Sequence, residues 1–217
     1  MIPRGVNHSL FKPGDYQSCR RKLGFTIGEN LILFVGRLEI LKGIDRMLKG
    51  YSLVKDSVPA RILILGGDES NNDYKAYLES LASGLGIGDR VSFSGAVPQE
   101  ELPAYYSAAD ITIVPSYYES FCLVLLESLA CGTPVITSDI GAARQIINDP
   151  RAGAVLEANT PEKIAEKIAE YLKPGRTKEA VTARKAVAEY DWNRICGCLF
   201  NEYSNLKDSR QLCQSPA

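Results

Sequence analysis

Long apolar runs are absent from this chain. No stretch of its 217 residues comes close to the roughly 20 consecutive apolar residues that a membrane-spanning helix needs. The first residues, MIPRG, also lack the apolar core of a signal peptide. The formal net charge is only −1, which argues against a nucleic-acid binder, because such proteins concentrate positive charge on one face. We therefore expect a cytosolic, globular protein that does not bind nucleic acid.

Residues that bind metals are few and poorly spaced. The chain has one histidine, His8, and six cysteines, of which only Cys196 and Cys198 lie close together. A zinc site needs clustered Cys and His ligands, as in a C-x-x-C pair. We therefore expect six reduced thiols, no metal site, and His8 in a solvated loop.

Three familiar enzyme motifs are missing as well. No G-x-G-x-x-G follows the first apolar run, and neither G-x-x-x-x-G-K-[ST] nor G-x-S-x-G occurs. These absences argue against a nicotinamide dehydrogenase, a P-loop NTPase and an α/β-hydrolase, because each depends on its own loop to bind phosphate or to place a nucleophile.

The chain does contain a regular alternation of strand-like and helix-like segments. Apolar runs of strand length occupy residues 31–35, 61–65, 90–94, 110–114, 134–137 and 154–156. Helical patterns occupy residues 43–55, 74–85, 100–108, 121–131, 142–147, 161–172, 177–189 and 192–206. Strands that are apolar on both faces and alternate with helices form a parallel sheet that is covered on both sides. We therefore predict an α/β fold, a doubly wound Rossmann-like parallel sheet of about six strands with extra C-terminal helices.

The chain divides into three segments. Residues 1–30 form a turn-rich lead-in, residues 31–206 form the α/β domain, and residues 207–217 form a polar tail. Doubly wound sheets bind ligands at the carboxyl ends of their strands, where loops lead into helix N-termini. The candidate binding loops are residues 36–42, 66–72, 95–98, 115–123 and 138–142.

Two cations flank the first of these loops. Arg37 follows the first strand, and Lys42 opens the next helix. Such a pair can converge on one anion, and the anion would relieve the unfavourable position of a lysine at the positive end of a helix dipole. The alternative is an ordinary solvated pair, and the spacing alone does not decide between the two.

Two glutamates mark the junction between the fourth strand and its helix. Glu127 lies in a helix that is apolar nearly all round, so its carboxylate should be buried and needs a hydrogen-bond donor such as a ribose hydroxyl. Glu119 precedes that helix and, alternatively, is an acid that the helix dipole favours. The neighbouring amides of Phe121, Cys122 and Leu123 are natural partners for a diphosphate.

A pair of glycines ends the second strand. Gly66 and Gly67 precede Asp68, and glycine at such a position lets a ligand approach the backbone closely. The same three residues also suit an ordinary turn, so they support a binding site only together with the other motifs.

Taken together, six motifs in this order resemble one family. They are FVGR with LKG (residues 34–43), GGD (66–68), VSFSG (91–95), YYSAAD (105–110), PSYYESF (115–121) and ESLACGTPV (127–135). They are similar to the C-terminal, donor-binding domain of GT-B glycosyltransferases of the glycosyltransferase 4 family. The PSYYESF motif looks closest to the branch of sucrose-phosphate synthase and mycothiol glycosyltransferase. Residues 3–13 resemble the interdomain linker of that family, so residues 1–30 are expected to follow an acceptor-binding N-terminal domain.

The resemblance implies a role for each candidate residue. Arg37 and Lys42 would hold the donor diphosphate and stabilise it as the leaving group. Glu119 would contact hydroxyls of the transferred sugar, and Glu127 would bind the ribose hydroxyls. Val97 would contact the base through its backbone. Backbone contacts with the donor are also implied at Gly36, Gly66, Gly67, Phe121, Cys122 and Leu123.

The implied activity is retaining transfer of a hexosyl unit, preferably from a UDP-sugar, to an acceptor held by the N-terminal domain. We expect the present chain alone to be inactive, and any membrane contact to be made by that other domain. No metal or other cofactor is implied, because cations and helix amides stabilise the developing charge. The alternatives are a nucleotide-sugar-binding module without catalysis and a GT-B sugar-nucleotide epimerase.

The chain departs from the family pattern at two points. Cys122 replaces the usual glycine, and a side chain there would crowd the donor or narrow the choice of sugar. The family's histidine near the reacting sugar belongs to the N-terminal domain, so the resemblance does not assign that role to His8.

Overall fold

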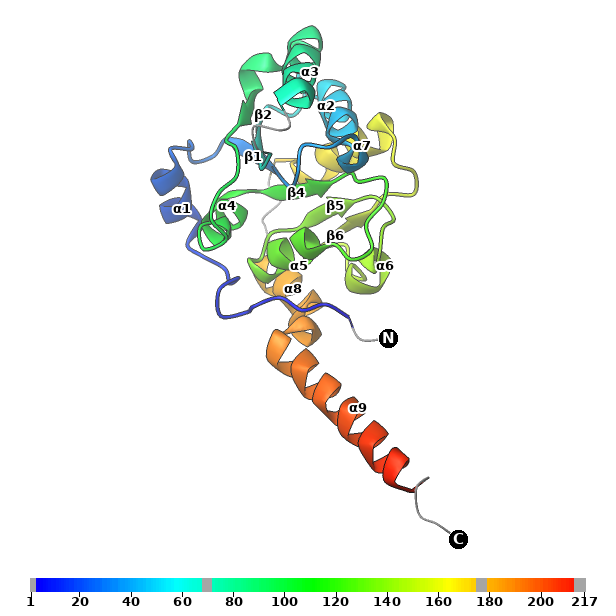
Figure 1. Ribbon diagram of the computed structural model, residues 1–217. Helices are drawn as coiled ribbons and strands as arrows, with labels where there is room; N and C mark the ends of the chain where they lie inside the picture. The colour runs from blue at the N-terminus through cyan, green and yellow to red at the C-terminus, as the bar shows by residue number, and fades with distance from the viewer. Residues whose placement is uncertain (1–2, 68–71, 175–178, 213–217) are drawn as a thin grey trace.

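Six parallel strands form one sheet at the centre of the structure (Figure 1). The computed structural model describes residues 3–67, 72–174 and 179–212. The strands are β1 (Asn30–Val35), β2 (Ala60–Leu65), β3 (Val91–Phe93), β4 (Ile111–Val114), β5 (Val135–Thr137) and β6 (Gly153–Val155). Their order is β3-β2-β1-β4-β5-β6, so the winding reverses between β1 and β4, whose carboxyl ends form the topological switch point.

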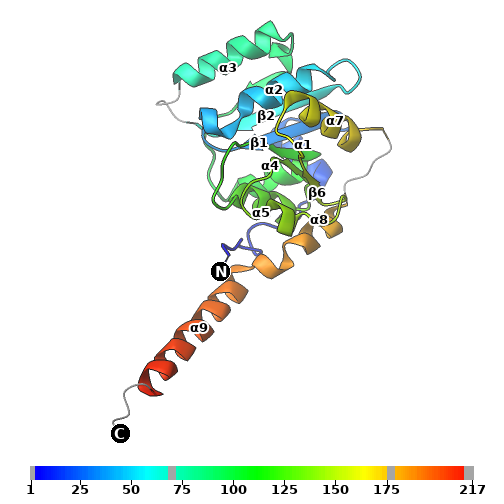
Figure 2. The same ribbon diagram turned by 90° about the vertical axis from the view of Figure 1, so that its right-hand side faces the viewer.

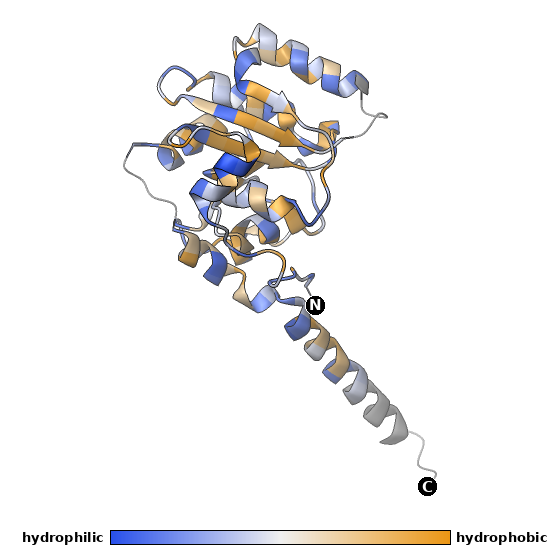
Figure 3. Cartoon of the chain, turned by 90° about the vertical axis from the view of Figure 1, so that its left-hand side faces the viewer, coloured by the Kyte–Doolittle hydropathy of each residue, from blue (hydrophilic) through white to orange (hydrophobic). Residues whose placement is uncertain are grey.

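Alternate residues of the central strands pack on opposite faces of the sheet. In β1, Leu31 and Leu33 belong to one buried apolar cluster, and Ile32 and Phe34 belong to the other. Side chains with a period of two produce this division. Figure 3 shows the strands as hydrophobic segments, as expected for strands buried on both faces.

Helices cover both faces (Figure 2), which confirms the predicted doubly wound α/β architecture. One face carries α2 (Ile44–Ser52), α3 (Asn72–Gly84) and α7 (Pro161–Tyr171). The opposite face carries α1 (Tyr16–Leu23), α4 (Leu102–Ala108), α5 (Leu123–Ala130), α6 (Ala143–Ile146) and α8 (Ala180–Ala186). The 3-10 turns are η1 (Ile40–Lys42), η3 (Gly88–Arg90) and η4 (Ala188–Tyr190).

The last helix, α9 (Trp192–Leu212), extends away from the sheet and its covering helices (Figures 1 and 2). It continues past residue 206, where the sequence pattern predicted its end. Neither α9 nor any other helix in the described ranges combines the length and the apolar character that crossing a membrane requires.

The lead-in segment contains a helix that sequence interpretation missed. Asp15 caps α1 by accepting a hydrogen bond from the Ser18 amide at 2.9 Å, and Gly24 ends the helix in the left-handed conformation. The buried Arg20 of this helix pairs with Asp110 at 2.6 Å. This ion pair fastens α1 to the residue that precedes β4.

Other helices also begin or end at residues that differ from the prediction. The helix predicted for residues 43–55 is α2, which ends three residues earlier, and Lys42 does not open it but ends the separate turn η1. The helix predicted from residue 121 begins at Leu123, with Cys122 as its cap. The helix predicted for residues 177–189 is α8 followed by η4. The predicted loop at 66–72 is described only in part, and Asp68 lies outside the described residues.

His8 lies in a turn, as predicted for a loop residue, but it is only partly exposed to solvent. Its Nε2 is buried without a hydrogen-bond partner among the described residues, and burial, with the charge of Arg184, lowers the pKa of the imidazole. The cause is the adjacent backbone, because the Val6 amide donates to the Tyr190 carbonyl at 2.7 Å. This contact draws residues 6–8 against the segment that precedes α9.

Candidate functional site

A pocket lies where β1, β2 and β3 end. It has a volume of about 320 Å³ and is lined by Val35, Gly36, Arg37, Leu65, Gly66, Gly67, Ala96, Val97 and Leu102. We call it the carboxyl-end pocket. Apart from Arg37, its lining consists of glycines and aliphatic residues. The predicted positions that it brings together are Gly36, Arg37, Gly66, Gly67 and Val97.

The loops around this pocket are held together by their backbones. The Gly36 amide donates to the Leu65 carbonyl at 3.0 Å, and the Gly66 amide donates to the Gly95 carbonyl at 2.6 Å. Gly66 has φ +118°, and a Cβ atom there would lie 2.0 Å from the carbonyl oxygen of Gly36. Only glycine permits this approach, which explains its presence at the end of β2.

The loops after β1 and β4 bring two charged candidates into contact. Lys42 Nζ lies 2.6 Å from Glu119 Oε1, and their side chains are only 18% and 19% exposed. The Ser116 hydroxyl donates to the same carboxylate oxygen at 3.2 Å. Partial burial strengthens such a charge-assisted hydrogen bond. The structure thus places a cation and a carboxylate together at the switch point of the sheet.

This contact depends on close packing of the two loops. Gly43 has φ +65°, and a Cβ atom there would lie 2.1 Å from the carbonyl oxygen of Pro115. The Tyr117 amide donates to the Leu41 carbonyl at 2.8 Å. Because β1 and β4 are neighbours in the sheet, their loops meet across the switch point.

Arg37 points elsewhere. Its side chain is 74% exposed and pairs with Glu39 at 2.6 Å, whereas Lys42 faces Glu119. The expected convergence of the two cations on one anion therefore requires Arg37 to leave Glu39. An exposed ion pair contributes only about 0–1 kcal/mol to stability, so breaking it costs little free energy.

Glu127 is buried on α5, as predicted. Its Oε2 accepts a hydrogen bond from the Tyr106 hydroxyl at 2.9 Å. Burial raises the pKa of the Glu127 carboxyl, and the hydrogen bond from Tyr106 opposes this shift. Burial also raises the pKa of Tyr106 well above its ordinary value, so this phenol remains a donor. The carboxylate is thus already held by one protein hydroxyl.

The N-terminus of α5 adjoins these side chains. Cys122 occupies the N-cap position without a capping hydrogen bond from its side chain, and the amides that follow it from Leu123 onward lack acceptors within the helix. Burial raises the pKa of the Cys122 thiol to about 12, which leaves it neutral and unreactive. The charges of Glu119, Lys42 and Glu127 also act on this pKa, so these groups share one neighbourhood.

Sequence interpretation missed three side chains that contact the predicted residues. Tyr106 holds Glu127, Ser116 holds Glu119, and the ring of Tyr190 lies 6.4 Å from the ring of Phe121. Tyr106 and Ser116 fall within the YYSAAD and PSYYESF motifs. Each is a polar residue close to a buried strand, and this was the sequence signal that could have indicated their role. No local pattern around Tyr190 indicates its contact, because it arises only from the fold.

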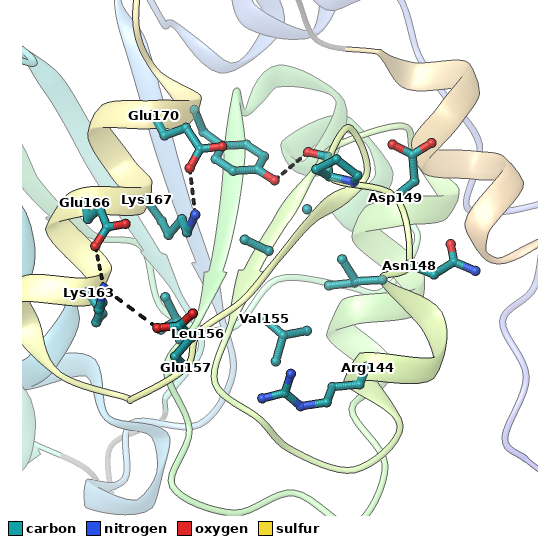
Figure 4. Close-up of a pocket in the computed structure, with 15 residues that line it drawn as sticks. Arg144, Asn148, Asp149, Val155, Leu156, Glu157, Lys163, Glu166, Lys167 and Glu170 are labelled. Carbon is teal, nitrogen blue, oxygen red and sulfur yellow. Dashed lines mark hydrogen bonds and ion pairs between the residues drawn. The ribbon is translucent and has the colours of Figure 1, made fainter.

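A second pocket, the α6–α7 pocket, lies beside the edge strand β6 and has a volume of about 370 Å³ (Figure 4). Its charged walls are paired within the protein: Lys163 with Glu166 at 2.8 Å, and Lys167 with Glu170 at 2.7 Å. The predicted site residues, all within the described ranges, do not line it. The carboxyl-end pocket and the adjoining switch point are therefore the stronger candidate site.

Comparison with known proteins identifies the family to which the chain belongs. Residues 15–188 match the family Glycosyl transferases group 1, and the chain belongs to this family. It is 35% identical over 218 residues to the D-inositol 3-phosphate glycosyltransferase of Acidothermus cellulolyticus, with coverage of 97% of this chain and 49% of the relative. The family resemblance predicted from the motifs is confirmed.

Two solved structures share the fold. Sucrose-phosphate synthase from Thermosynechococcus elongatus matches with a TM-score of 0.84 and 30% identity, covering 96% of this chain and 52% of that one. The C-terminal domain of a glycosyl transferase group 1 family protein from Francisella tularensis matches with a TM-score of 0.76 and 25% identity, covering 87% of this chain and 100% of that one. The chain therefore corresponds to the C-terminal half of a GT-B enzyme, and it spans about half the length of the curated relatives it matches.

Proposed function

We propose that this chain is the donor-binding half of a retaining glycosyltransferase and that it binds a nucleoside-diphosphate sugar, preferably a UDP-hexose. The observation that carries the proposal is the 2.6 Å contact between Lys42 and Glu119 at the switch point, beside the N-terminus of α5. A cation and a helix N-terminus together attract a diphosphate. The adjacent carboxylate accepts hydrogen bonds from sugar hydroxyls.

In this proposal the phosphates take over part of the contact that Lys42 makes with Glu119. Arg37 leaves its exposed pair with Glu39 and adds a second positive charge. The amides at Phe121, Cys122 and Leu123 supply further donors. Charges and dipoles that are fixed before the reaction stabilise the departing diphosphate, so the proposal calls on no metal or other cofactor.

The nucleoside would occupy the carboxyl-end pocket. Gly36, Gly66 and Gly67 line it without side chains, and Val97, which also lines it, would contact the base through its backbone. Glu127 accepts the ribose hydroxyls as well as the Tyr106 hydroxyl, because a carboxylate has about four acceptor positions. The aliphatic lining suits a flat base, which buries apolar surface there.

The acceptor would be held by an N-terminal domain. The supporting observation is length, since this chain aligns with only 49% of its D-inositol 3-phosphate glycosyltransferase relative. The rim beside Lys42 and Glu119 also carries exposed apolar side chains that would face such a domain: Ile40, Leu41, Tyr117 and Tyr118. Transfer requires the acceptor to be held about 3–3.5 Å from the donor carbon, so the present chain alone should not catalyse it.

Titration calorimetry with UDP, GDP and ADP tests the donor site. We expect UDP to bind more tightly than GDP or ADP. Tighter binding of GDP or ADP would contradict the base preference alone, whereas the absence of heat with all three would contradict the donor site.

The rival proposal is a nucleotide-sugar-binding module without catalysis. A transfer assay distinguishes the two, with UDP-glucose and UDP-N-acetylglucosamine as donors, a broad pool of acceptors, and UDP release as the readout. The enzyme-half proposal predicts transfer only when a separately supplied acceptor domain is present, with the anomeric configuration retained in the product. Robust transfer by this chain alone would contradict the assignment of the acceptor site to a separate domain. No transfer in either case would favour the binding module without catalysis.

A further inference from the structure

Two polar side chains fasten the loop after β4 from the side of α2 and α7. Asn159, in the connection between β6 and α7, donates from Nδ2 to the Pro115 carbonyl at 2.8 Å and to the Ser116 carbonyl at 3.4 Å. Arg46 on α2 donates to the Asn159 carbonyl, and its guanidinium lies 4.0 Å from the centre of the Tyr117 ring. We call Arg46 and Asn159 the brace.

The Asn159 amide holds the loop with its nitrogen and leaves its own oxygen without a partner among the described residues. Its Oδ1 is buried and has no hydrogen-bond partner among the described residues, which is unfavourable for a polar atom. Reversing the amide would place Oδ1 against the Pro115 carbonyl oxygen, and two acceptors would then face each other. The orientation of the Asn159 amide is therefore determined by the hydrogen bonds that its Nδ2 donates to the loop.

The braced loop carries Glu119 and packs against the turn that carries Lys42, so it contacts both members of the ion pair at the switch point. The hydroxyl of Ser116, inside the braced segment, donates to Glu119 Oε1 at 3.2 Å. Gly43, next to Lys42, packs so closely on the Pro115 carbonyl that a Cβ atom there would lie 2.1 Å from its oxygen. Displacement of the braced loop would therefore move Glu119 relative to Lys42.

We propose that Arg46 and Asn159 are positioning residues that hold Glu119 in place for the sugar of the donor. This inference rests on the proposed function, because it takes Glu119 to be the sugar-contacting carboxylate. Asn159 holds the carbonyls of Pro115 and Ser116, and Arg46 lies against the Tyr117 ring, so both act on Glu119 through the loop.

Matched substitutions test the brace in the full chain. Asn159→Asp keeps the shape of the side chain but replaces the donor with an acceptor, and Arg46→Lys keeps the charge but removes the planar group on Tyr117. Glu157→Gln, in the same connection and 85% exposed, is the control. By calorimetry, Asn159→Asp and Arg46→Lys should each raise the Kd for UDP-glucose about fivefold and should not weaken binding of UDP.

A double-mutant cycle shows whether Asn159 acts through Glu119. In a Glu119→Gln background, Asn159→Asp should cause no further loss of UDP-glucose binding. Fully additive losses, or equal weakening of UDP and UDP-glucose, would overturn the positioning role. Absence of UDP binding by the unchanged chain would instead contradict the proposed function.

A ligand-free measurement tests the same geometry. The Lys42 ammonium should give a protected ¹H–¹⁵N signal in the NMR spectrum of the unchanged chain, because its ion pair is mostly buried. Asn159→Asp should shift and broaden that signal in the same way as Glu119→Gln, while Glu157→Gln should leave it unchanged. A Lys42 signal unaffected by Asn159→Asp in the folded protein would overturn the proposal without any donor present.

Discussion

Lys42 and Glu119, separated by 77 residues in the sequence, form an ion pair of 2.6 Å across the topological switch point of the sheet. One partner comes from the turn before α2 and the other from the loop before α5. In the proposed donor complex a phosphate and Glu119 both attract Lys42. Substitutions at the two positions should therefore affect nucleotide binding in opposite directions.

Glu119→Gln should strengthen binding of UDP and reduce the additional affinity contributed by the sugar of UDP-glucose. Removal of the carboxylate frees Lys42 for phosphate, and the change should be about 0.5–1 kcal/mol for a partly exposed pair. The amide also loses acceptor capacity for sugar hydroxyls. Calorimetry with both ligands measures the two effects, and equal weakening of both would count against the proposed competition.

Lys42→Ala should weaken binding of UDP by about 1.5–3 kcal/mol and leave binding of uridine nearly unchanged, because it removes a charge-assisted contact to phosphate. Arg37→Ala should act in the same direction but less strongly, since its side chain is 74% exposed. Arg144→Ala, at the α6–α7 pocket, is the control and should have no effect. Equal losses for uridine and UDP would mean that Lys42 does not bind phosphate.

Glu127→Gln should stabilise the ligand-free chain increasingly as the pH rises. Burial raises the pKa of Glu127 in the folded state, so the stability from its protonated form is present below the ordinary value of 4.5 and is lost as the pH rises through the higher pKa. Glutamine carries no charge and still accepts from Tyr106. Thermal denaturation from about pH 4 to about pH 7 should show the gap in Tm widening in favour of the variant.

Glu166→Gln is the control for that experiment. Its hydrogen bond with Lys163 lowers the pKa of the Glu166 carboxyl, so its contribution to stability has the opposite pH dependence. This variant should not gain in Tm as the pH rises. A Glu127→Gln variant less stable than the unchanged chain at neutral pH would show that the ionised carboxylate supports the fold.

The same Glu127→Gln variant should bind UDP less tightly but lose little affinity for the 2′-deoxy analogue. A carboxylate accepts from both ribose hydroxyls, whereas the amide replaces one acceptor with a donor. Competition binding with the two nucleotides measures the difference. A stabilised variant with an unchanged preference for ribose would refute the ribose role and leave Glu127 without a part in donor binding.

The strands and the loops that follow them could be predicted, because both depend on local patterns. All six predicted strands agree with the observed ones to within one residue at each end. Glu127 was expected to be buried because apolar residues surround it in the sequence, and it is. The start of α1 also had a local signal, Asp15 followed by a helical pattern that ends at Gly24, but the turn-rich neighbourhood obscured it.

The side-chain partners could not be predicted, because they join elements that are distant in the sequence. Tyr106 reaches Glu127 from α4, and Asn159 reaches Pro115 from the connection that follows the edge strand β6. The exposed pair of Arg37 with Glu39 is local, but nothing in the sequence favours it over convergence with Lys42. Which partner a side chain contacts depends on the positions that the loops take once the sheet has formed.

The most direct test of the account is NMR mapping of UDP on the ¹⁵N-labelled chain. The account predicts that the perturbed backbone amides cluster at the carboxyl ends of the strands, at Gly36, Gly66, Val97 and Leu123. Amides beside β6 that line the α6–α7 pocket, such as that of Glu157, should remain unchanged. Perturbation confined to that pocket, or none at saturating UDP, would contradict the assignment of the donor site.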